Sequence, residues 1–356
     1  MSAKIKAVLK IFGVLITAVL VFAIGLIGWL TIDEFDPEPV ETVPVSIEGE
    51  EKVSAPVLGE EISVLTFNIG YCDLGKDSDF FMDGGEKVRN GDKEQVLKNL
   101  AGVIGILEES DADIYFIQEA DSSSSRSYKI NETYEIEKAL SARTSYARNY
   151  DCDFVPFPWP PMGKVTSGIM TNTEFYITTG ERIALPCPFS WPVSAANLKR
   201  CLLINRCEIE GSDKQLVMVN LHLEAYDDGE GKIAQTKMLW DILKDEYEKG
   251  NYVIAGGDFN QTFPGAIEKY PLMDPDFWTP GVLSEEDLPE GWNYVYDDEN
   301  PTCRLLNGPY DENATQHYVI DGFIISPNVE LLSAETLDCG FEYSDHNPVL
   351  MNVKLK

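Results

Sequence analysis

The chain has 356 residues, of which 44% are hydrophobic and 25% charged, and this is ample for one large globular domain or two smaller ones. Its formal net charge of −32 argues against a protein that grips long nucleic acid through a broad basic face, but not against one that binds a small phosphate ester through a metal. Seven cysteines occur without a CxxC pair, which argues against a zinc cluster.

The N-terminus is typical of a membrane helix. Lys4, Lys6 and Lys10 precede an uncharged run over residues 11–30, which is long enough to cross a bilayer as a helix. The alternative is a cleaved signal peptide, but its apolar region is usually shorter and we find no small-x-small cleavage site at the end of this run, so we favour an anchor. Lysines before the run and acidic residues after it place residues 1–10 in the cytoplasm and the rest of the chain outside it.

The segment after this helix differs in composition from the rest of the chain. Residues 31–61 are acidic, contain four prolines and show little periodicity. We therefore expect a tether that leads into a domain over residues 62–356.

Two strands in the first half of the domain end in polar residues. Residues 62–70 alternate and carry Asn68 near their end, and residues 113–119 form a short apolar run that closes on Glu119. Asn68 is either a ligand or a turn-forming residue. Burying a carboxylate at a strand end is costly without a partner, which for Glu119 is either a metal or an arginine. Between the strands we expect a loop and then a helix over residues 93–110.

The middle of the chain alternates between strands, helices and an aromatic segment. The expected elements are a helix at 132–141, an irregular Pro-rich lobe at 154–161, paired strands at 167–171 and 174–179, strands at 198–209 and 214–223, and a helix at 232–249. The chain has only three histidines, and His222 lies at a strand end. It is either a functional group or a structural histidine.

A further strand over residues 252–260 carries two glycines and then Asp258 and Asn260. Strand alternation puts these two side chains on one face, and the glycines permit close approach of another backbone. The alternative is a simple Gly-Gly-Asp turn. After a long surface excursion, a strand over residues 317–325 carries Asp321.

The domain closes on a carboxylate beside an imidazole, in a turn that precedes a last strand. This turn is either functional or an ordinary surface turn. With the earlier strand ends, it completes a set of acids, amides and imidazoles: Asn68, Glu119, His222, Asp258, Asn260, Asp321, Asp345 and His346. Oxygen-rich sets suit Mg²⁺ or Mn²⁺, and such a site suits hydrolysis at phosphorus.

Six segments of the chain resemble, in order, the motifs of the endonuclease/exonuclease/phosphatase (DNase I-like) superfamily. They are LTFNI at 65–69, IQE at 117–119, NLHL at 220–223, GDFN at 257–260, IDGF at 320–323 and SDHNP at 344–348. The resemblance covers residues 62–356. It implies an α+β fold, a four-layer sandwich of two packed mixed β-sheets flanked by helices, after the N-terminal membrane helix.

The resemblance implies a metal site. Glu119 would ligate Mg²⁺ or Mn²⁺, helped by Asn68 and Asp345. Some relatives carry an acid two residues after the first Asn of this pattern. Here that position is Gly70, so the set of protein ligands is thinner or is completed by water.

The resemblance also implies catalytic roles. Asp258 would orient or deprotonate the attacking water, and Asn260 would hold the phosphate. His346, steered by Asp321, would act as general base or as a charge-stabilising imidazolium. His222 matches a histidine that, in the diesterase-like branches, protonates the leaving group.

The substrate is less defined than the chemistry. Arg126 and Arg304 are candidate phosphate contacts. The membrane helix and the acidity favour a surface phosphodiesterase acting on a lipid head group or another small diester. An exported nuclease, a phosphomonoesterase and a non-catalytic binding module are the alternatives. No protein partner is indicated, and a glycosylation sequon at Asn260, inside the expected site, favours a bacterial cell surface.

Overall fold

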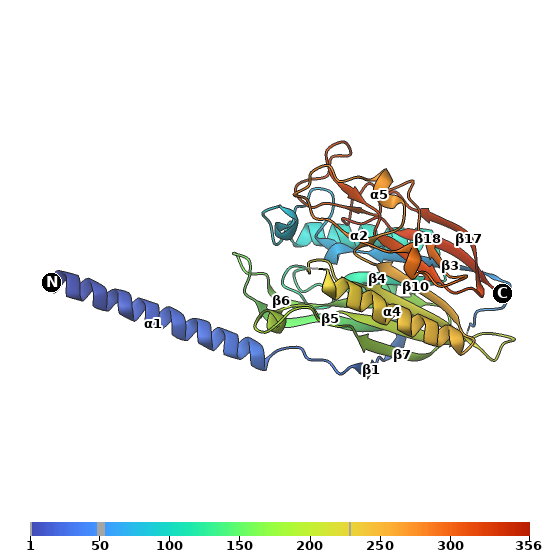
Figure 1. The fold of residues 1–356 in the computed structure, drawn as a ribbon, viewed down its shortest axis with the longest axis horizontal. Coiled ribbons are helices and arrows are strands. Elements are labelled where there is room, and N and C mark those ends of the chain that lie inside the picture. Colours follow the sequence, from blue (N-terminus) through green and yellow to red (C-terminus); the bar gives the residue numbers. More distant parts are fainter. Residues whose placement is uncertain (1, 48–53, 228) are drawn as a thin grey trace.

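Two mixed sheets of seven strands each pack face to face within the part of the chain that the computed structural model describes, residues 2–47, 54–227 and 229–356 (Figure 1). Sheet A contains, in spatial order, β1 (Val40–Thr42), β7 (Ile177–Ala184), β8 (Cys201–Glu208), β9 (Gln215–His222), β10 (Tyr252–Asp258), β16 (Asp321–Ile325) and β13 (Asn293–Val295). Sheet B contains β17 (Val329–Thr336), β18 (Val349–Leu355), β3 (Glu61–Asn68), β4 (Ile114–Asp121), β6 (Gly163–Thr173), β5 (Arg143–Val155) and β2 (Val45–Ile47).

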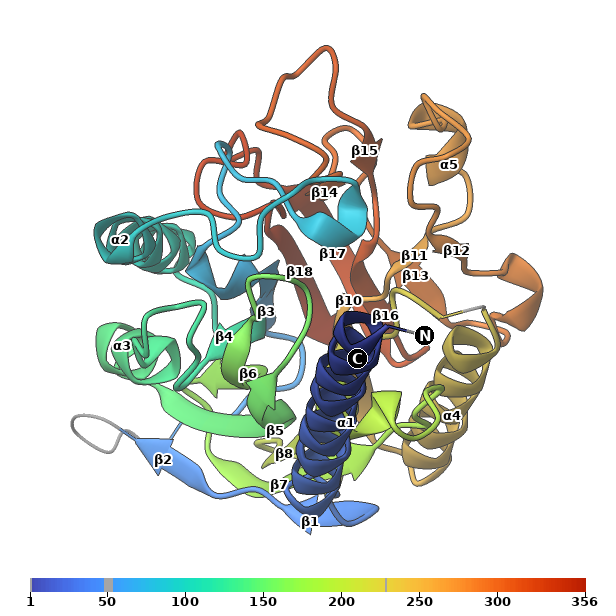
Figure 2. The same ribbon diagram turned by 90° about the vertical axis from the view of Figure 1, so that its left-hand side faces the viewer.

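Helices cover the outer faces of both sheets, on opposite sides of the domain (Figure 2). They are α2 (Lys93–Ser110) and α3 (Glu132–Leu140) over sheet B, and α4 (Glu230–Glu248) over sheet A. The apolar stripe of α2, at Val96, Leu100 and Val103, packs with Leu65 and Phe67 of β3. The order helix, sheet, sheet, helix confirms the predicted four-layer sandwich.

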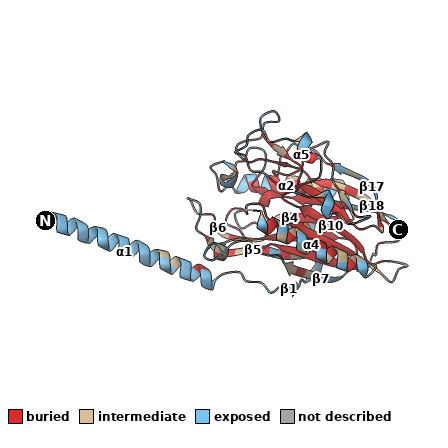
Figure 3. Ribbon diagram, viewed as in Figure 1, coloured by how far each residue is buried: buried red, intermediate tan, exposed pale blue. Residues whose placement is uncertain are grey.

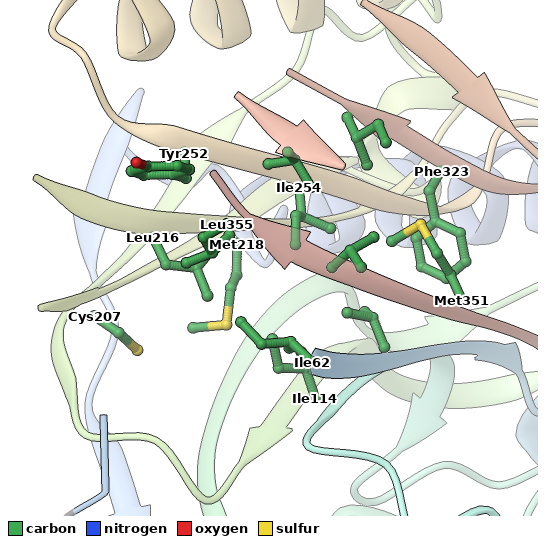
Figure 4. Packing of buried hydrophobic residues seen from close by; sticks show 14 of the residues in the cluster. Ile62, Ile114, Cys207, Leu216, Met218, Tyr252, Ile254, Phe323, Met351 and Leu355 are labelled. Atoms are coloured by element: carbon green, nitrogen blue, oxygen red, sulfur yellow. The ribbon is translucent and has the colours of Figure 1, made fainter. Parts of the chain in front are cut away.

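The central strands of both sheets are largely buried (Figure 3), and alternate residues of these strands build the core between the sheets (Figure 4). Ile62 and Val64 of β3 belong to this inner core, whereas Leu65 and Phe67 belong to the cluster under α2. Successive strand residues face opposite sides, so a strand that is buried on both faces reads as a nearly continuous apolar run. The polar residues at the ends of these runs therefore stand out in the sequence.

A buried polar contact joins the two sheets close to these strand ends. Asn220 of β9 donates from Nδ2 to the carbonyl oxygens of Ile117 (3.2 Å) and Met170 (2.8 Å) in sheet B. In return, Gln118 Nε2 donates to Asn220 Oδ1 (2.8 Å). An unpaired amide would be costly at this depth, so these bonds favour one alignment of β9 against β4 and β6.

Helix α1 (Ala3–Ile32) projects from one end of the domain, and the C-terminus lies at the other end (Figure 1). It is long and apolar enough to cross a membrane, as a membrane anchor or a signal sequence would be. Its last turns are docked on the domain. Leu30 is buried, Thr31 Oγ1 accepts a hydrogen bond from Trp191 Nε1 (2.8 Å), and the Trp29 ring centroid lies 6.5 Å from that of Phe154.

The segment that we expected as a tether joins both sheets. β1 pairs with β7 at the edge of sheet A, and β2 pairs with β5 at the edge of sheet B. Strands of three residues are too short to show a clear alternation, which is why the sequence did not indicate them. Residues 48–53 of this segment lie outside the described residues.

Two strand predictions were wrong, one in its pairing and one in the number of strands. The strands expected as a pair at 167–171 and 174–179 lie in different sheets, because β6 pairs with β4 and β5 whereas β7 pairs with β1 and β8. The strand expected over 317–325 is two strands, β15 (His317–Tyr318) and β16, and β15 pairs with β14 (Cys303–Arg304). Periodicity reports which residues are buried, but not which strand lies beside them.

Candidate functional site

The polar strand ends line the floor of a cavity of about 660 Å³. β3 and β4 are parallel neighbours in sheet B, and β9 and β10 are parallel neighbours in sheet A. The carboxyl ends of parallel strands meet at one edge of a sheet, and the two edges lie together here. Asn68, His222 and Asp258 are the last residues of β3, β9 and β10.

Glu119 reaches the cavity through an irregularity in its strand. The pairing of β4 with β6 shifts between Ile117 and Ala120, and Glu119 has a φ of +56°, in the left-handed region. A β-bulge redirects the side chain, and positive φ at a non-glycine residue is a strained conformation typical of functional sites. Gln118, just before it, is used instead in the contact between the sheets.

Asn260 lies beside Asp258 because of a turn rather than a strand. β10 ends at Asp258, and Asn260 has a φ of +50°, so strand alternation is not what brings the two side chains together. The main-chain N–H of Asn260 donates to Asp258 Oδ1 (2.9 Å), and its Nδ2 donates to the carbonyl oxygen of Leu223 (2.9 Å). Gly257 is needed, since a Cβ there would lie 1.9 Å from the carbonyl oxygen of Leu221 in the adjacent strand.

Asn68 lies at the centre of the cluster. Its Nδ2 is 3.0 Å from Asp258 Oδ2, 3.5 Å from Glu119 Oε1 and 3.4 Å from His346 Nε2. Its Oδ1 accepts the main-chain N–H of Gly70 (3.1 Å). One amide therefore orients carboxylates from both sheets and lies beside His346 of the closing turn.

His346 is oriented by Asp321. The two form a hydrogen bond of 2.8 Å between Nδ1 and Oδ2, and both residues are buried. Burial alone would lower the pKa of His346, but Asp321, Cys303 and Asp345 together outweigh burial and raise the pKa well above its ordinary value, and Asp321 is the largest of these contributors. The ring is thus an imidazolium at neutral pH, and its Nε2 lies 3.8 Å from Asp258 Oδ2 and 3.9 Å from Asp345 Oδ2.

His222 lies in the same cluster, but its pKa is shifted in the opposite direction from that of His346. Its Nε2 is 3.5 Å from Asp258 Oδ2 and 4.0 Å from Glu119 Oε1. Burial and the nearby Arg200 guanidinium hold its pKa well below the ordinary value, so the ring is neutral at neutral pH. The two imidazoles at the site therefore differ in charge.

The carboxylates at the floor are crowded. Burial raises the pKa of Glu119, raises that of Asp258 to about 6 and raises that of Asp345 to about 7. A divalent cation would offset this concentration of negative charge, and the oxygen-rich donor set fits Mg²⁺ or Mn²⁺. Asp258, Asp321 and His346 also have ligand atoms within 4.8 Å of one another, but Asp321 is already used in orienting His346.

Gly70 is the position at which some relatives carry an acid. It has a φ of +51°, and a Cβ there would lie 2.7 Å from Asp345 Oδ1. Any side chain at this position would therefore displace Asp345, which explains why an acid cannot be added to the cluster here.

Each arginine that lines the cavity in the described part of the chain is engaged elsewhere. Arg126 forms a bidentate pair with Asp121 (3.1 and 3.0 Å) and lies 3.6 Å from the ring centroid of Tyr71. Arg200 pairs with Glu224 (3.2 Å). The guanidinium of Arg304 donates to the carbonyl oxygens of Gly75, Ser78, Leu305 and Gly308.

Sequence reasoning did not name several charged and polar residues that line the cavity, among them Asp83, Arg200, Glu224 and Tyr226. Arg200 and Glu224 form the pair described above, behind His222. Tyr226 donates from its hydroxyl to Asp83 Oδ1 (2.9 Å), and both residues line the cavity. Glu224 and Tyr226 follow His222 at alternate positions, and this was the one signal in the sequence that pointed to them.

The sequence matches no family model and no curated protein. Solved structures do match the fold of this chain. An endonuclease/exonuclease/phosphatase from Beutenbergia cavernae matches with a TM-score of 0.56 at 15% identity, over 83% of this chain and 72% of that one. A family protein from Bacteroides thetaiotaomicron gives 0.53 at 14%, over 83% and 98%. The human Nocturnin catalytic domain, with bound sulfate, gives 0.52 at 14%, over 88% and 97%.

These likenesses, together with the two packed sheets and their flanking helices, define the architecture. The chain has the endonuclease/exonuclease/phosphatase (DNase I-like) fold.

Proposed function

We propose that this protein is a metal-dependent phosphodiesterase held at a membrane surface. The observation that carries the proposal is the cavity floor, where carboxylates, amides and two imidazoles from both sheets converge on one space. The fold supports it, since the structural neighbours include proteins named endonuclease/exonuclease/phosphatase. The sulfate in the Nocturnin domain is a tetrahedral anion of the shape of a phosphate.

The charge of the floor makes a cation necessary for an anionic substrate. The cavity-lining arginines are engaged by carboxylates or carbonyl oxygens, so a phosphate would face acidic groups. Glu119, Asn68 and Asp345 would hold Mg²⁺ or Mn²⁺. When bound, the cation polarises a phosphoryl oxygen and stabilises the leaving oxygen.

Asp258 is the residue best placed to receive a proton from the attacking water. Both of its oxygens are held, Oδ1 by the Asn260 N–H and Oδ2 by Asn68 Nδ2, so the carboxylate is fixed in orientation. Asn260 uses one N–H of its amide on Leu223, and the second is available for a phosphoryl oxygen.

The two histidines serve different steps. His346, kept protonated by Asp321, would stabilise charge that develops on the phosphoryl group. His222 is neutral, and a neutral imidazole donates one hydrogen bond, so we assign it to hold the leaving oxygen. The resemblance implies that His222 protonates the leaving group, and both roles place its ring beside the leaving oxygen.

The packing of α1 supports an anchor that is retained. Leu30 is buried against the domain and Thr31 accepts a hydrogen bond from Trp191, so removal of the helix would expose apolar surface. Lysines at its N-terminal end favour a cytoplasmic N-terminus and an extracytoplasmic domain. The net charge of −32 favours a small diester or a lipid head group over long nucleic acid.

The test uses the full chain in lipid nanodiscs. Hydrolysis of bis(p-nitrophenyl) phosphate is compared with that of p-nitrophenyl phosphate, in Mg²⁺, in Mn²⁺ and in chelator. We expect chelator-sensitive cleavage of the diester, with loss of activity in Glu119→Gln and full activity in the matched exposed control Glu108→Gln. Preference for the monoester would make the protein a phosphatase, and full activity of Glu119→Gln would refute the site.

A further inference from the structure

The cavity changes character between its floor and its mouth. The floor is polar, but the wall nearer the mouth is apolar and is assembled from three separate parts of the chain. Its members include Ile27 and Leu30 of α1, Phe157 and Met162 of the loop between β5 and β6, and Val193 of the loop before β8. A site for a fully water-soluble diester needs no such wall, whereas a ligand with an apolar portion does.

The same loops expose large apolar side chains to solvent. Trp159 is 90% exposed, Phe157 67%, Trp191 60% and Val193 56%. Exposed apolar groups that gather on one face mark an interaction site, and tryptophan is enriched where a protein meets the bilayer interface. Trp191 also donates its Nε1–H to Thr31 of α1, so this face is continuous with the end of the membrane helix.

The end of α1 is held against this face by contacts on both sides of Ile32. Before it, Leu26 and Leu30 pack in a cluster with Tyr150 and Val155 of β5. After it, Lys199 Nζ donates to Glu34 Oε1 (2.6 Å), and the Arg182 guanidinium lies 5.6 Å from the ring centroid of Phe35. The cavity wall formed by Ile27 and Leu30 therefore stays beside the C-terminal end of α1.

We infer that the ligand of this cavity is a membrane amphiphile that carries a phosphate ester. The ester lies at the polar floor, and the hydrocarbon portion runs along Ile27, Leu30 and Phe157 toward the bilayer. The anchor helix is then one wall of the binding site rather than only a tether. This inference rests on the proposed function for the chemistry at the floor, and it adds the class of substrate and the way it arrives.

The experiment measures binding, so that its outcome does not depend on turnover. Butyl, hexyl and octyl phosphate are titrated with Mg²⁺ by calorimetry into the full chain in lipid nanodiscs, and the heat of titration into empty nanodiscs is subtracted. Each methylene that leaves water strengthens binding by about fourfold. We expect octyl phosphate to bind at least tenfold more tightly than butyl phosphate.

Two variants locate the effect. Ile27→Ser combined with Phe157→Ser removes apolar surface from the wall at two exposed positions, and we expect the dependence on chain length to become shallow. Val282→Ser, at a position that is also exposed (58%) and does not line the cavity, should keep the dependence of the unchanged chain.

Each outcome decides one of the two proposals. Equal affinity for the three phosphates, as expected if a protein segment or a second copy of the chain covered the wall, would overturn the inference. The same holds if the double variant keeps the full dependence. Chain-length dependence without hydrolysis of any diester would leave the inference standing and overturn the proposed function.

Discussion

The floor and the mouth of the cavity differ in which side chains are buried and which face solvent. At the floor, polar side chains are buried and most are held by hydrogen bonds to one another, as Asn68 is to Asp258 and His346 is to Asp321. At the mouth, apolar side chains such as Trp159 and Phe157 face solvent. Both arrangements cost free energy in water, because one buries charge and the other exposes hydrocarbon. The comparison indicates that each region is built for a ligand. At the floor the ligand would offset the buried charge, and at the mouth it would cover the exposed apolar side chains.

The largest expected effect on activity comes from a substitution at the floor of the cavity. His346→Ala removes the imidazolium and should lower kcat for the diester by on the order of 10²–10³-fold, the range for a preorganised donor that stabilises developing charge. The matched control is His317→Gln, since His317 is the remaining histidine and packs against Phe341 and Tyr310 away from the cavity floor. Equal losses in the two variants would show that the effect is not specific to the site.

Asp321→Asn tests how the floor sets the charge of His346. Asp321 is the largest of the groups that raise the pKa of His346, so the Asn variant should lower that pKa, and the imidazolium should lose its proton at lower pH. If the imidazolium is the active form, the limb of the pH–rate profile at which activity falls with rising pH moves to lower pH. If the neutral ring acts as base, activity instead extends to lower pH. An imidazole resonance that titrates at an unchanged pH in NMR would contradict the pairing.

Gly70→Ala tests the packing of the floor without changing a polar group. A Cβ there would lie 2.7 Å from Asp345 Oδ1, and we expect Mg²⁺ affinity, measured by calorimetry, to fall by about tenfold. Gly340→Ala is the control, since Gly340 has a similar φ of +59° and nothing within 4 Å of a Cβ. Both variants should lose about 1 kcal/mol of stability from the backbone alone, and only Gly70→Ala should lose metal.

The smallest effect is expected at the mouth. Trp159→Ser should change the free energy of unfolding by less than about 0.5 kcal/mol, because the side chain is 90% exposed. Trp292→Ser, at a position 4% exposed and packed against Trp240, should cost about 3–5 kcal/mol. Chemical denaturation measures both. A large loss in Trp159→Ser would mean that the mouth is structural and would remove the contrast between the two regions.

Much of the fold was predictable because its signals are local. The helix expected over residues 93–110 is α2 (Lys93–Ser110), and the strand predicted to end in Asn68 is β3. The pairing of strands was less predictable. β6 and β7 are adjacent in sequence and apolar in pattern, yet lie in different sheets, because burial and not pairing determines the periodicity.

The candidate site was predictable as a set but not as an arrangement. The eight polar residues from Asn68 to His346 surround the cavity floor, or orient a residue that does. The backbone conformations that bring these side chains to the cavity floor could not be read from the sequence. Glu119 depends on a bulge and Asn260 on a left-handed turn, and neither conformation has a distinct sequence signal. Arg126 looked free in the sequence and is bound to Asp121.

By itself, the sequence determined most of the longer helices and strands, which strand ends are polar, and that an apolar helix precedes the domain. These properties follow from local spacing, since the period at which apolar residues recur along the chain indicates which residues are buried. Only the tertiary structure decided that the polar ends meet, that the nearby arginines are already paired, and that the end of α1 forms a wall of the cavity. Several of these contacts join residues far apart in the chain, as Asn68 and Asp258 are by 190 positions and Thr31 and Trp191 by 160, and local spacing carries no information about them.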